Sequence, residues 1–234
     1  MVLILLFKIL KENLTKLKID DWREKSTNIV NEWKAELNTL RDSDSKPIRP
    51  ERLMKELSEV IPADSIVASD TGHTAMWTVQ NLWMNKKWNF IRCAGSLGWG
   101  FPAAIGAKCA FPDKNVFCLT GDGGLWYHFT ELETAVRSDI PTITIVNNNN
   151  ALNQEYDIFM NAYDGKPSNR WTEMWYFNKV SFAELANNIG AFGIRVTDPA
   201  DIKEAVKEAM KSKKPSIVEI DGDVNALAPT AWSK

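Results

Sequence analysis

The sequence has few of the residues that build metal centres and disulfides. Its 234 residues include 3 cysteines and 2 histidines. Cys93, Cys109 and Cys118 form no C-x-x-C pair and stand in apolar surroundings, which is typical of reduced core thiols in a cytoplasmic protein. With only His73 and His128 present, a histidine-rich metal site is excluded, and no motif marks a nucleophile for a Ser-His-Asp triad.

The sequence also lacks an excess of one charge and a long hydrophobic run. Its 28 basic and 30 acidic residues give a formal net charge of −2, so nothing favours nucleic acid or an anionic membrane as a partner. The apolar run at residues 2–10 is too short to span a membrane and lacks the flanks of a signal peptide. We therefore predict a cytoplasmic protein with no nucleic-acid and no membrane partner. We expect this run to form a helix or strand that packs on another surface, with an interfacial anchor as the alternative.

The length of the chain allows one α/β domain with a shorter segment before it. Residues 19–40 are rich in Lys and Glu and carry an apolar stripe that includes Trp22 and Trp33, which predicts an amphipathic helix. The polar stretch at residues 41–50 contains two prolines and indicates a boundary. We divide the chain into a helical segment with linker, residues 1–46, and a domain, residues 47–234.

Apolar runs and helical periodicities alternate along this domain. The predicted strands are residues 65–69, 90–93, 116–119, 143–146, 193–196 and 216–220. The predicted helices are residues 52–60, 74–82, 102–110, 182–189 and 199–210, with one more after residue 124. Residues 156–176 are aromatic and predicted to be irregular. The alternation predicts an α/β fold, a doubly wound parallel sheet with helices on both faces.

Two of the predicted strands end on polar, glycine-rich or asparagine-rich loops. The strand at residues 116–119 is followed by Gly-Asp-Gly-Gly at residues 121–124, and the strand at 143–146 by four asparagines. Because parallel strands joined by a right-handed connection end at the same edge of a sheet, Asp122 is expected to meet the asparagines. Glycines and backbone N–H groups suit phosphate, and a carboxylate beside carboxamide and carbonyl oxygens suits Mg²⁺. The sequence predicts a magnesium and diphosphate site, with a simple turn and a polar loop as the alternative.

The same residues resemble the signature of thiamine diphosphate-dependent enzymes, Gly-Asp-Gly followed by an Asn pair after a strand. Asn149 follows Asp122 by 27 residues, as in that family. Residues 95–113 and 69–80 resemble the turn and helix before the signature, and the diphosphate-side loop, of acetolactate synthases. The resemblance covers roughly residues 47–221 and implies the C-terminal, diphosphate-binding domain of the acetolactate synthase-like superfamily. The cofactors it implies are thiamine diphosphate and Mg²⁺.

The resemblance assigns roles to the signature residues. Asp122, the side chain of Asn149 and the main-chain carbonyl of Ala151 correspond to the metal ligands of the family. Gly123 and Gly124 are expected to offer backbone N–H groups to the diphosphate. Further cofactor contacts are implied at Gly121, Leu152 and Asn153.

Upstream residues correspond to the rest of the cofactor site. His73 and Thr74 match positions on the far side of the diphosphate, although the family often has Gln-His there, and a hydrogen-bonded loop histidine is the alternative for His73. Gly95 aligns with the carbonyl that accepts the aminopyrimidine amino group, and Ser96 follows it. Leu97 matches the bulky residue that bends the cofactor into a V shape, with core packing as the alternative.

Two features depart from the family pattern. The catalytic glutamate of the family lies on a pyrimidine domain that this sequence does not contain. Glu131 and Glu133 are expected on the helix after the diphosphate turn, on the wrong side of the cofactor, as helix-surface or packing residues. Gln154 and Glu155 replace the apolar wall of acetolactate synthases, which weakens a pyruvate-condensing assignment.

These features leave three functions open. The first is part of a carboligase or decarboxylase that acts on a 2-oxo acid and is incomplete as a lone chain. The others are a non-catalytic cofactor-binding module and a generic α/β nucleotide-phosphate binder. Because the cofactor site of the family lies between subunits, we expect a homodimer, or a hetero-oligomer with a pyrimidine-domain subunit.

Overall fold

The computed structural model describes residues 2–14, 19–85 and 87–228. The chain divides into two compact units, Met1–Asp42 and Ser43–Lys234. The first unit consists of the helices α1 (Val2–Leu14) and α2 (Ile19–Arg41). Residues 2–10 are therefore helical rather than extended, and the amphipathic helix predicted at residues 19–40 is confirmed. In the part of the chain that the structure describes, no helix is long and apolar enough to cross a membrane.

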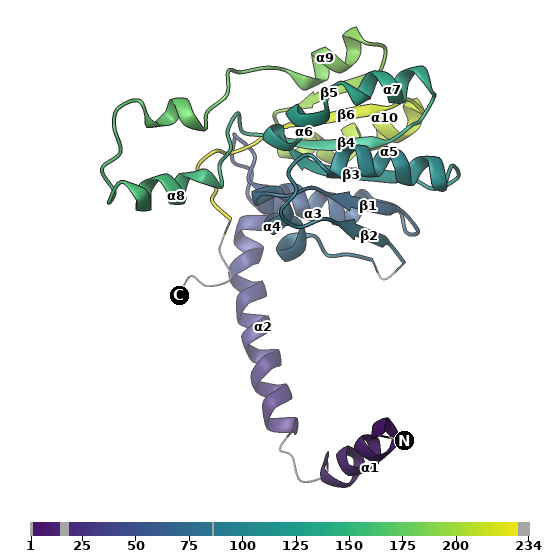
Figure 1. Ribbon diagram of the computed structural model, residues 1–234, viewed down its shortest axis with the longest axis vertical. Coiled ribbons are helices and arrows are strands. Elements are labelled where there is room, and N and C mark those ends of the chain that lie inside the picture. The colour runs from purple at the N-terminus through teal and green to yellow at the C-terminus, as the bar shows by residue number, and fades with distance from the viewer. Residues whose placement is uncertain (1, 15–18, 86, 229–234) are drawn as a thin grey trace. The chain divides into compact units, whose positions relative to one another are not determined.

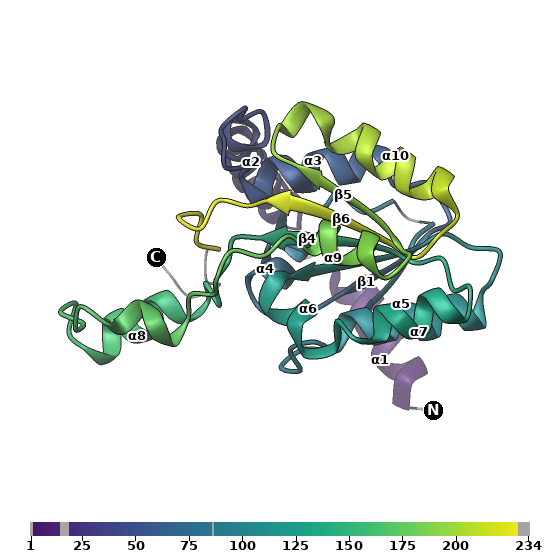
Figure 2. The ribbon, with the colours of Figure 1, turned by 90° about the horizontal axis from the view of Figure 1, so that it is seen from above.

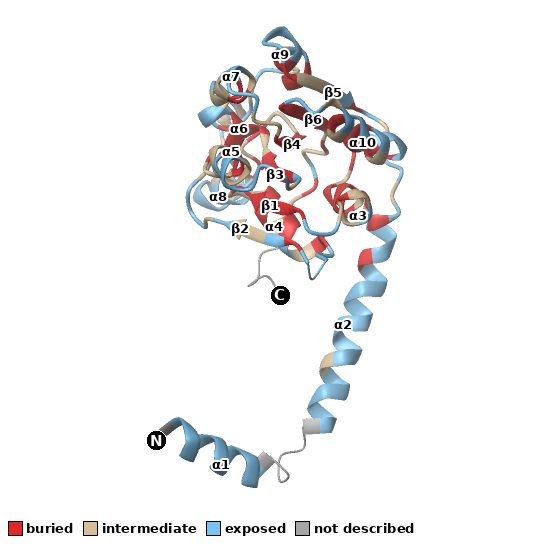
Figure 3. Ribbon diagram, turned by 90° about the vertical axis from the view of Figure 1, so that its right-hand side faces the viewer, coloured by how far each residue is buried: buried red, intermediate tan, exposed pale blue. Residues whose placement is uncertain are grey.

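The first unit exposes much of its apolar surface. Phe7 on α1 is 72% exposed and Trp22 on α2 is 69% exposed. Figure 3 shows α1 and α2 coloured as exposed over most of their length. These helices therefore carry apolar side chains that are not used in a core of their own.

The second unit is built on a six-stranded sheet with the order β2-β1-β3-β4-β6-β5, in which all paired strands are parallel (Figure 1). The predicted doubly wound parallel sheet is confirmed. The strands are β1 (Ile66–Ser69), β2 (Asn89–Arg92), β3 (Val116–Gly121), β4 (Ile143–Asn148), β5 (Phe192–Val196) and β6 (Ser216–Asp221). The register places Gly121 beside Asn147. The ends of β3 and β4 therefore lie next to each other.

Helices cover both faces of the sheet (Figure 2). One apolar cluster contains side chains of α3 (Pro50–Val60), α4 (His73–Asn81) and α10 (Ile202–Ser212). The other contains side chains of α5 (Gly100–Ala110), α6 (Asp122–His128), α7 (Glu131–Arg137) and α9 (Phe182–Asn188). In β3, Phe117 and Leu119 join the first cluster, whereas Val116 and Cys118 join the second. A continuous apolar strand is thus explained by burial on both sides.

The structure corrects several predicted elements. The single helix expected after residue 124 is two short helices, α6 and α7, interrupted at Phe129 and Thr130. The segment expected to be irregular contains α8 (Glu155–Ala162) and a 3-10 helix, η1 (Trp171–Met174). The Tyr156 ring contacts those of Trp171 and Trp175, with centroids 5.4 and 5.7 Å apart. These aromatic residues pack on one another, which the sequence pattern did not indicate. The helix predicted at residues 199–210 begins as a 3-10 turn, η2 (Pro199–Asp201).

The prediction that all three cysteines are core thiols is wrong for two of them. Cys118 is buried in β3, but Cys93 is only partly buried and Cys109 is exposed. The helix α5 turns Phe101 and Ala104 toward the sheet. Cys109 stands near the end of this helix, outside that apolar face.

Candidate functional site

A cavity of about 250 Å³ opens where the loops after β1, β3 and β4 meet. The neighbours of β1 in the sheet are β2 on one side and β3 on the other. The chain passes from β1 to β2 through α4 and from β2 to β3 through α5, and these helices contribute to opposite apolar clusters. The strand order therefore reverses at β1. Doubly wound sheets bind ligands at the carboxyl ends of the strands beside such a reversal.

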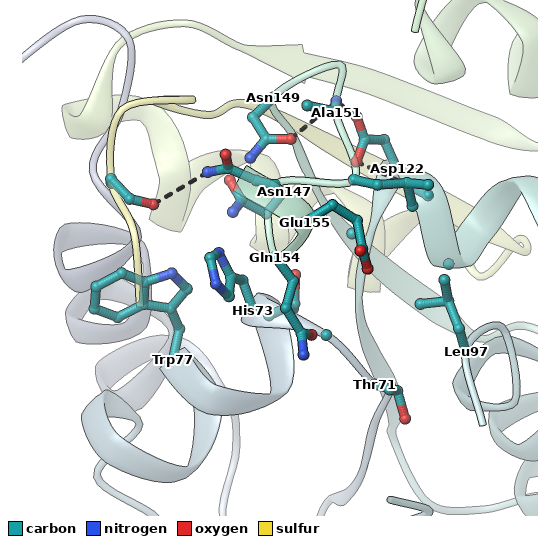
Figure 4. Close-up of a pocket in the computed structure, with 18 of the residues that line it drawn as sticks. Thr71, His73, Trp77, Leu97, Asp122, Asn147, Asn149, Ala151, Gln154 and Glu155 are labelled. Atoms are coloured by element: carbon teal, nitrogen blue, oxygen red, sulfur yellow. Dashed lines mark hydrogen bonds between the residues drawn. The ribbon is translucent and has the colours of Figure 1, made fainter. Parts of the chain in front are cut away.

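Three residues predicted as metal ligands converge on one side of this cavity (Figure 4). Asp122 begins α6 directly after β3, and its Oδ2 accepts a hydrogen bond from the Ala151 N–H at 2.9 Å. The Oδ1 of Asn149 accepts from the same N–H at 3.2 Å. The carboxylate and the carboxamide oxygen therefore lie within a few ångströms of one backbone group.

The main chain of Ala151 faces the site because of its neighbours. Leu152 N–H donates to the Trp175 carbonyl at 2.8 Å, and Phe177 N–H donates to the Asn150 carbonyl at 2.8 Å. These bonds form an antiparallel bridge between Ala151 and Tyr176. In such a bridge the N–H and C=O of the central residue point away from the partner strand. The Ala151 carbonyl is thus outside the cross-strand ladder and directed to the side on which Asp122 lies.

Asp122 is a buried carboxyl group, and its burial disfavours the ionised form. The residue is 3% exposed. Burial raises the pKa of Asp122 to about 7, although hydrogen bonds from the Gly123 and Ala151 N–H groups lower it. A bound cation would relieve this cost, since an opposite charge favours the ionised form.

Glycines leave room for the close packing around Asp122. A Cβ at Gly123 would lie 2.5 Å from Leu152, and one at Gly124 would lie 2.2 Å from an oxygen of Asp70. Gly121 lines the cavity at the end of β3. The Gly123 N–H, predicted for the diphosphate, donates instead to Asp122 Oδ1 at 2.8 Å.

The loop after β1 supplies the opposite wall. Gly72 has φ 88° and is followed by His73 and Thr74, which line the cavity at the start of α4. The Nδ1 of His73 is buried and has no hydrogen-bond partner among the described residues. Burial lowers the pKa of His73, although the charge of Asp157 raises it. A neutral imidazole therefore faces the cavity.

The other predicted residues lie around the rim, with one exception. Gly95 and Leu97 line the cavity, and Figure 4 shows Leu97 on the side away from His73. Ser96 is exposed and does not line it. Leu152, Asn153, Gln154 and Glu155 also line it.

Asn153 has a structural contact that the sequence did not predict. Its Nδ2 donates to the carbonyls of Val224 at 2.7 Å and Ala226 at 3.4 Å. This side chain thus holds the segment after β6 against the cavity, where Ala226 lines the wall. Trp77 is a further lining residue that sequence reasoning missed, and Asn147, one of the four asparagines expected at this edge, also lines the cavity.

Asp70, which sequence reasoning also missed, joins the loop after β1 to the loop after β2 and to the end of β3. It is fully buried, and its carboxylate accepts hydrogen bonds from the N–H groups of Thr71 at 2.8 Å and Gly98 at 3.0 Å. The hydroxyl of Thr120 donates to it at 2.9 Å. One carboxylate therefore fixes the loop after β1, the loop that carries Leu97, and the end of β3. A lone Asp after a strand gives no sequence signal for this role.

Replacing Asp70 by alanine is expected to destabilise the domain by about 3–5 kcal/mol, because it leaves several buried donors without an acceptor. Asp70→Asn should cost less than half of that, since an amide oxygen still accepts from Gly98 and its NH₂ can donate to Thr120. Urea unfolding of the two variants measures the difference. Equal losses of unfolding free energy in the two variants would show that the hydrogen-bond acceptor at position 70 is not the source of the stabilisation.

Comparisons with known proteins show the family to which the chain belongs. Residues 70–220 match the family model described as thiamine pyrophosphate enzyme, C-terminal TPP binding domain. The chain is 33% identical to the "Probable acetolactate synthase large subunit" of Methanococcus aeolicus over 216 residues, which cover 89% of this chain and 35% of that protein. It is 31% identical to the acetolactate synthase large subunit of Haemophilus influenzae over 207 residues, covering 87% and 34%.

A solved structure shows the same fold. The thiamine diphosphate-dependent 4-hydroxybenzoylformate decarboxylase of Rhodococcus jostii RHA1 matches with a TM-score of 0.64 and 27% identity, over 77% of this chain and 34% of that one. The fold and site thus define a cofactor-binding α/β domain of the thiamine diphosphate type. The chain belongs to the thiamine pyrophosphate enzyme family and contains its C-terminal TPP-binding domain. It spans about a third of the length of these relatives.

Proposed function

We propose that this chain is the diphosphate- and Mg²⁺-binding part of a thiamine diphosphate-dependent enzyme that acts on a 2-oxo acid. The observation that carries the proposal is the convergence of the buried Asp122 carboxylate with Asn149 and the main chain of Ala151 at the end of β3. The relatives with printed activities include acetolactate synthases and a decarboxylase. The reaction is therefore a carboligation or a decarboxylation.

The donor set fits Mg²⁺. Asp122 offers a carboxylate oxygen, Asn149 a carboxamide oxygen and Ala151 a main-chain oxygen, which are the hard ligands that Mg²⁺ prefers. Within the described residues, no cluster of three or more His, Cys, Asp or Glu side chains could hold a metal. A single carboxylate with neutral oxygens also leaves positions for diphosphate oxygens, as Mg²⁺ sites with phosphate ligands do.

The surrounding walls fit the organic part of the cofactor. The glycines at the start of α6 let a diphosphate approach the backbone, and His73 and Thr74 face it from α4. Leu97 offers an apolar surface under the rings, and Gly95 stands beside it with φ 79°. When bound, thiamine diphosphate supplies a carbon nucleophile for the carbonyl of a 2-oxo acid. The residues of this chain hold and orient it.

The substrate side of the cavity is polar. Gln154 and Glu155 line it from the start of α8, and Figure 4 shows both side chains between His73 and Leu97. Glu155 carries the one carboxylate besides Asp122 among the described residues that line the cavity. We propose that these two residues form the substrate wall and select a substrate with polar groups near its carbonyl.

The catalytic glutamate is proposed to come from a pyrimidine domain on another chain. Glu131 hydrogen-bonds with Thr134, and Glu133 pairs with Arg137, so both serve the surface of α7. The proposed assembly is a homodimer or a hetero-oligomer with that subunit. The exposed apolar side chains of α1 and α2 support such an assembly. A non-catalytic thiamine diphosphate-binding module is the second candidate.

Thiamine diphosphate with Mg²⁺ should raise the melting temperature of the chain by about 3–6 °C at a tenfold excess over Kd, because a ligand of the folded state stabilises it. Thiamine without the diphosphate should have little effect, since most of the proposed contacts of this chain are with the diphosphate and Mg²⁺. ATP with Mg²⁺ is the decisive control. Equal stabilisation by ATP would identify a generic nucleotide-phosphate binder instead.

A further inference from the structure

The four consecutive asparagines at the end of β4 and directly after it have different contacts. Asn149 lines the cavity beside Asp122, as described above. Asn148 is buried and turned away from the cavity, and its Nδ2 donates to Glu219 Oε1 at 2.8 Å and to the Val180 carbonyl at 3.1 Å. Glu219 belongs to the adjacent strand β6 and is fully buried. A buried carboxylate thus lies directly behind the proposed metal-ligand loop.

Glu219 is saturated by donors from the neighbouring segment as well. Its Oε2 accepts from the Ser181 hydroxyl at 3.0 Å and from the Ala183 N–H at 2.9 Å. The guanidinium of Arg195 is 3.9 Å from Oε1 and forms a shorter bond with Asp221 at 2.9 Å. These three hydrogen bonds fix the orientation of the Glu219 carboxylate. In this orientation Oε1 accepts from Asn148, and Oε2 accepts from Ser181 and Ala183.

The side-chain oxygen of Asn148 acts on the loop itself. It accepts from the Asn150 N–H at 3.2 Å. Asn150 has φ 56°, a left-handed conformation that asparagine tolerates better than most residues. This turn reverses the chain between Asn149 and Ala151, so that the Asn149 oxygen and the Ala151 backbone both face Asp122.

We propose that Asn148 and Glu219 are positioning residues for the magnesium-ligand loop. Glu219 orients the amide of Asn148, and Asn148 in turn holds the Asn150 turn that presents Asn149 and Ala151 to the metal. Neither side chain lines the cavity, so both act through other residues. The inference rests on the proposed function, because it assigns the loop to Mg²⁺.

The chemistry of the pair makes a specific perturbation possible. In Glu219→Gln, the amide oxygen is taken by the Ser181 and Ala183 donors, which leaves the new NH₂ facing the NH₂ of Asn148. The amide of Asn148 must then turn over, which brings its NH₂ against the Asn150 N–H and breaks the turn. Asn148→Asp instead places two carboxylates face to face in the core.

The double variant Asn148→Asp with Glu219→Gln reverses the donor and acceptor of the pair. The new amide at position 219 would donate to the new carboxylate at position 148, and its oxygen would still accept from Ser181 and Ala183. The carboxylate at position 148 would still accept from the Asn150 N–H. The bond to the Val180 carbonyl and the charge pairing of Glu219 with Arg195 are lost. The swap should therefore restore the loop.

The test measures the Mg²⁺ concentration that gives half of the thermal stabilisation by thiamine diphosphate. Glu219→Gln should raise this midpoint at least tenfold, as loss of a ligand-orienting partner usually does, and the double variant should bring it back to within about threefold of wild type. The matched control is Val218→Ala, which removes apolar volume from the same strand without touching the loop. It should lower the melting temperature and leave the midpoint unchanged.

Hydrogen exchange in the ligand-free chain separates this proposal from the proposed function. The amides of Asn150 and Ala151 should exchange at least tenfold faster in Glu219→Gln than in Val218→Ala, whether or not the cofactor binds. If the wild type shows no Mg²⁺ response, the proposed function fails, and exchange still decides whether Glu219 holds the loop. The proposal would be overturned if Glu219→Gln changed neither the exchange rates of these amides nor the Mg²⁺ midpoint. It would also be overturned if the Mg²⁺ midpoint of the double variant were no lower than that of Asn148→Asp.

Discussion

Replacement of Asp122 by alanine is expected to abolish the Mg²⁺-dependent part of thiamine diphosphate binding. Asp122 offers the one charged ligand of the proposed site, and the neutral oxygens of Asn149 and Ala151 alone would hold Mg²⁺ weakly. The fold should survive, because the Ala151 N–H keeps its bond to Asn149 Oδ1. Calorimetric titration with thiamine diphosphate, with and without Mg²⁺, measures the loss, which we expect to exceed roughly 100-fold in affinity.

Two further variants make this result specific. Asn149→Ala removes the second side-chain ligand and should also eliminate the Mg²⁺ dependence. Glu133→Ala removes an exposed carboxylate on the nearby helix α7, where it pairs with Arg137, and should change nothing. A wild-type response to Mg²⁺ in either the Asp122 or the Asn149 variant would remove that residue from the ligand set.

The contribution of Asp122 to the stability of the ligand-free domain is expected to fall as the pH rises from about 4 to 7. Asp122 has a pKa of about 7 in the folded chain, against an ordinary value near 3.8. Between these values the folded state keeps a proton that the unfolded state releases, so a rise in pH favours unfolding. The loss is on the order of 4 kcal/mol at most, at about 1.36 kcal/mol for each pKa unit.

The variant Asp122→Asn isolates this contribution from those of other groups. It cannot ionise, so the difference in unfolding free energy between Asp122→Asn and wild type should grow as the pH rises from about 4 to 7 and level off above that range. Mg²⁺ with thiamine diphosphate should stabilise the wild type more as the pH rises through about 7, because the metal binds the carboxylate. Urea titrations at several pH values provide the data. Parallel stability curves for the two proteins would contradict the raised pKa.

The sequence predicted the sheet and the edge at which the site lies, because both depend on local patterns. Continuous apolar runs such as that of β3 reflect burial on two faces, and the carboxyl ends of parallel strands must share an edge. The register places Gly121 beside Asn147, which brings the residues that follow, Asp122 and Asn149 among them, to the same edge. The aromatic packing around Trp175 could not be predicted in this way, since it depends on contacts of short segments with each other.

The sequence pattern also did not predict the residues that support the site. Asp70 and Glu219 are carboxylates buried by contacts from segments far away in the chain, such as Gly98 for Asp70 and Asn148 for Glu219. A single acidic residue in a strand or just after one usually indicates exposure. Only the folded arrangement shows that each is buried and saturated with hydrogen bonds.

The most direct test of the central claim is a crystal structure of the chain with thiamine diphosphate and Mg²⁺. The account predicts a metal ion bound by the Asp122 carboxylate, Asn149 Oδ1 and the Ala151 carbonyl, each at about 2.1 Å, with diphosphate oxygens in other positions of the octahedron. The glycines after β3 would face the diphosphate, and Leu97 would lie against the rings. A metal held by other residues, or a cofactor bound outside this cavity, would contradict the account.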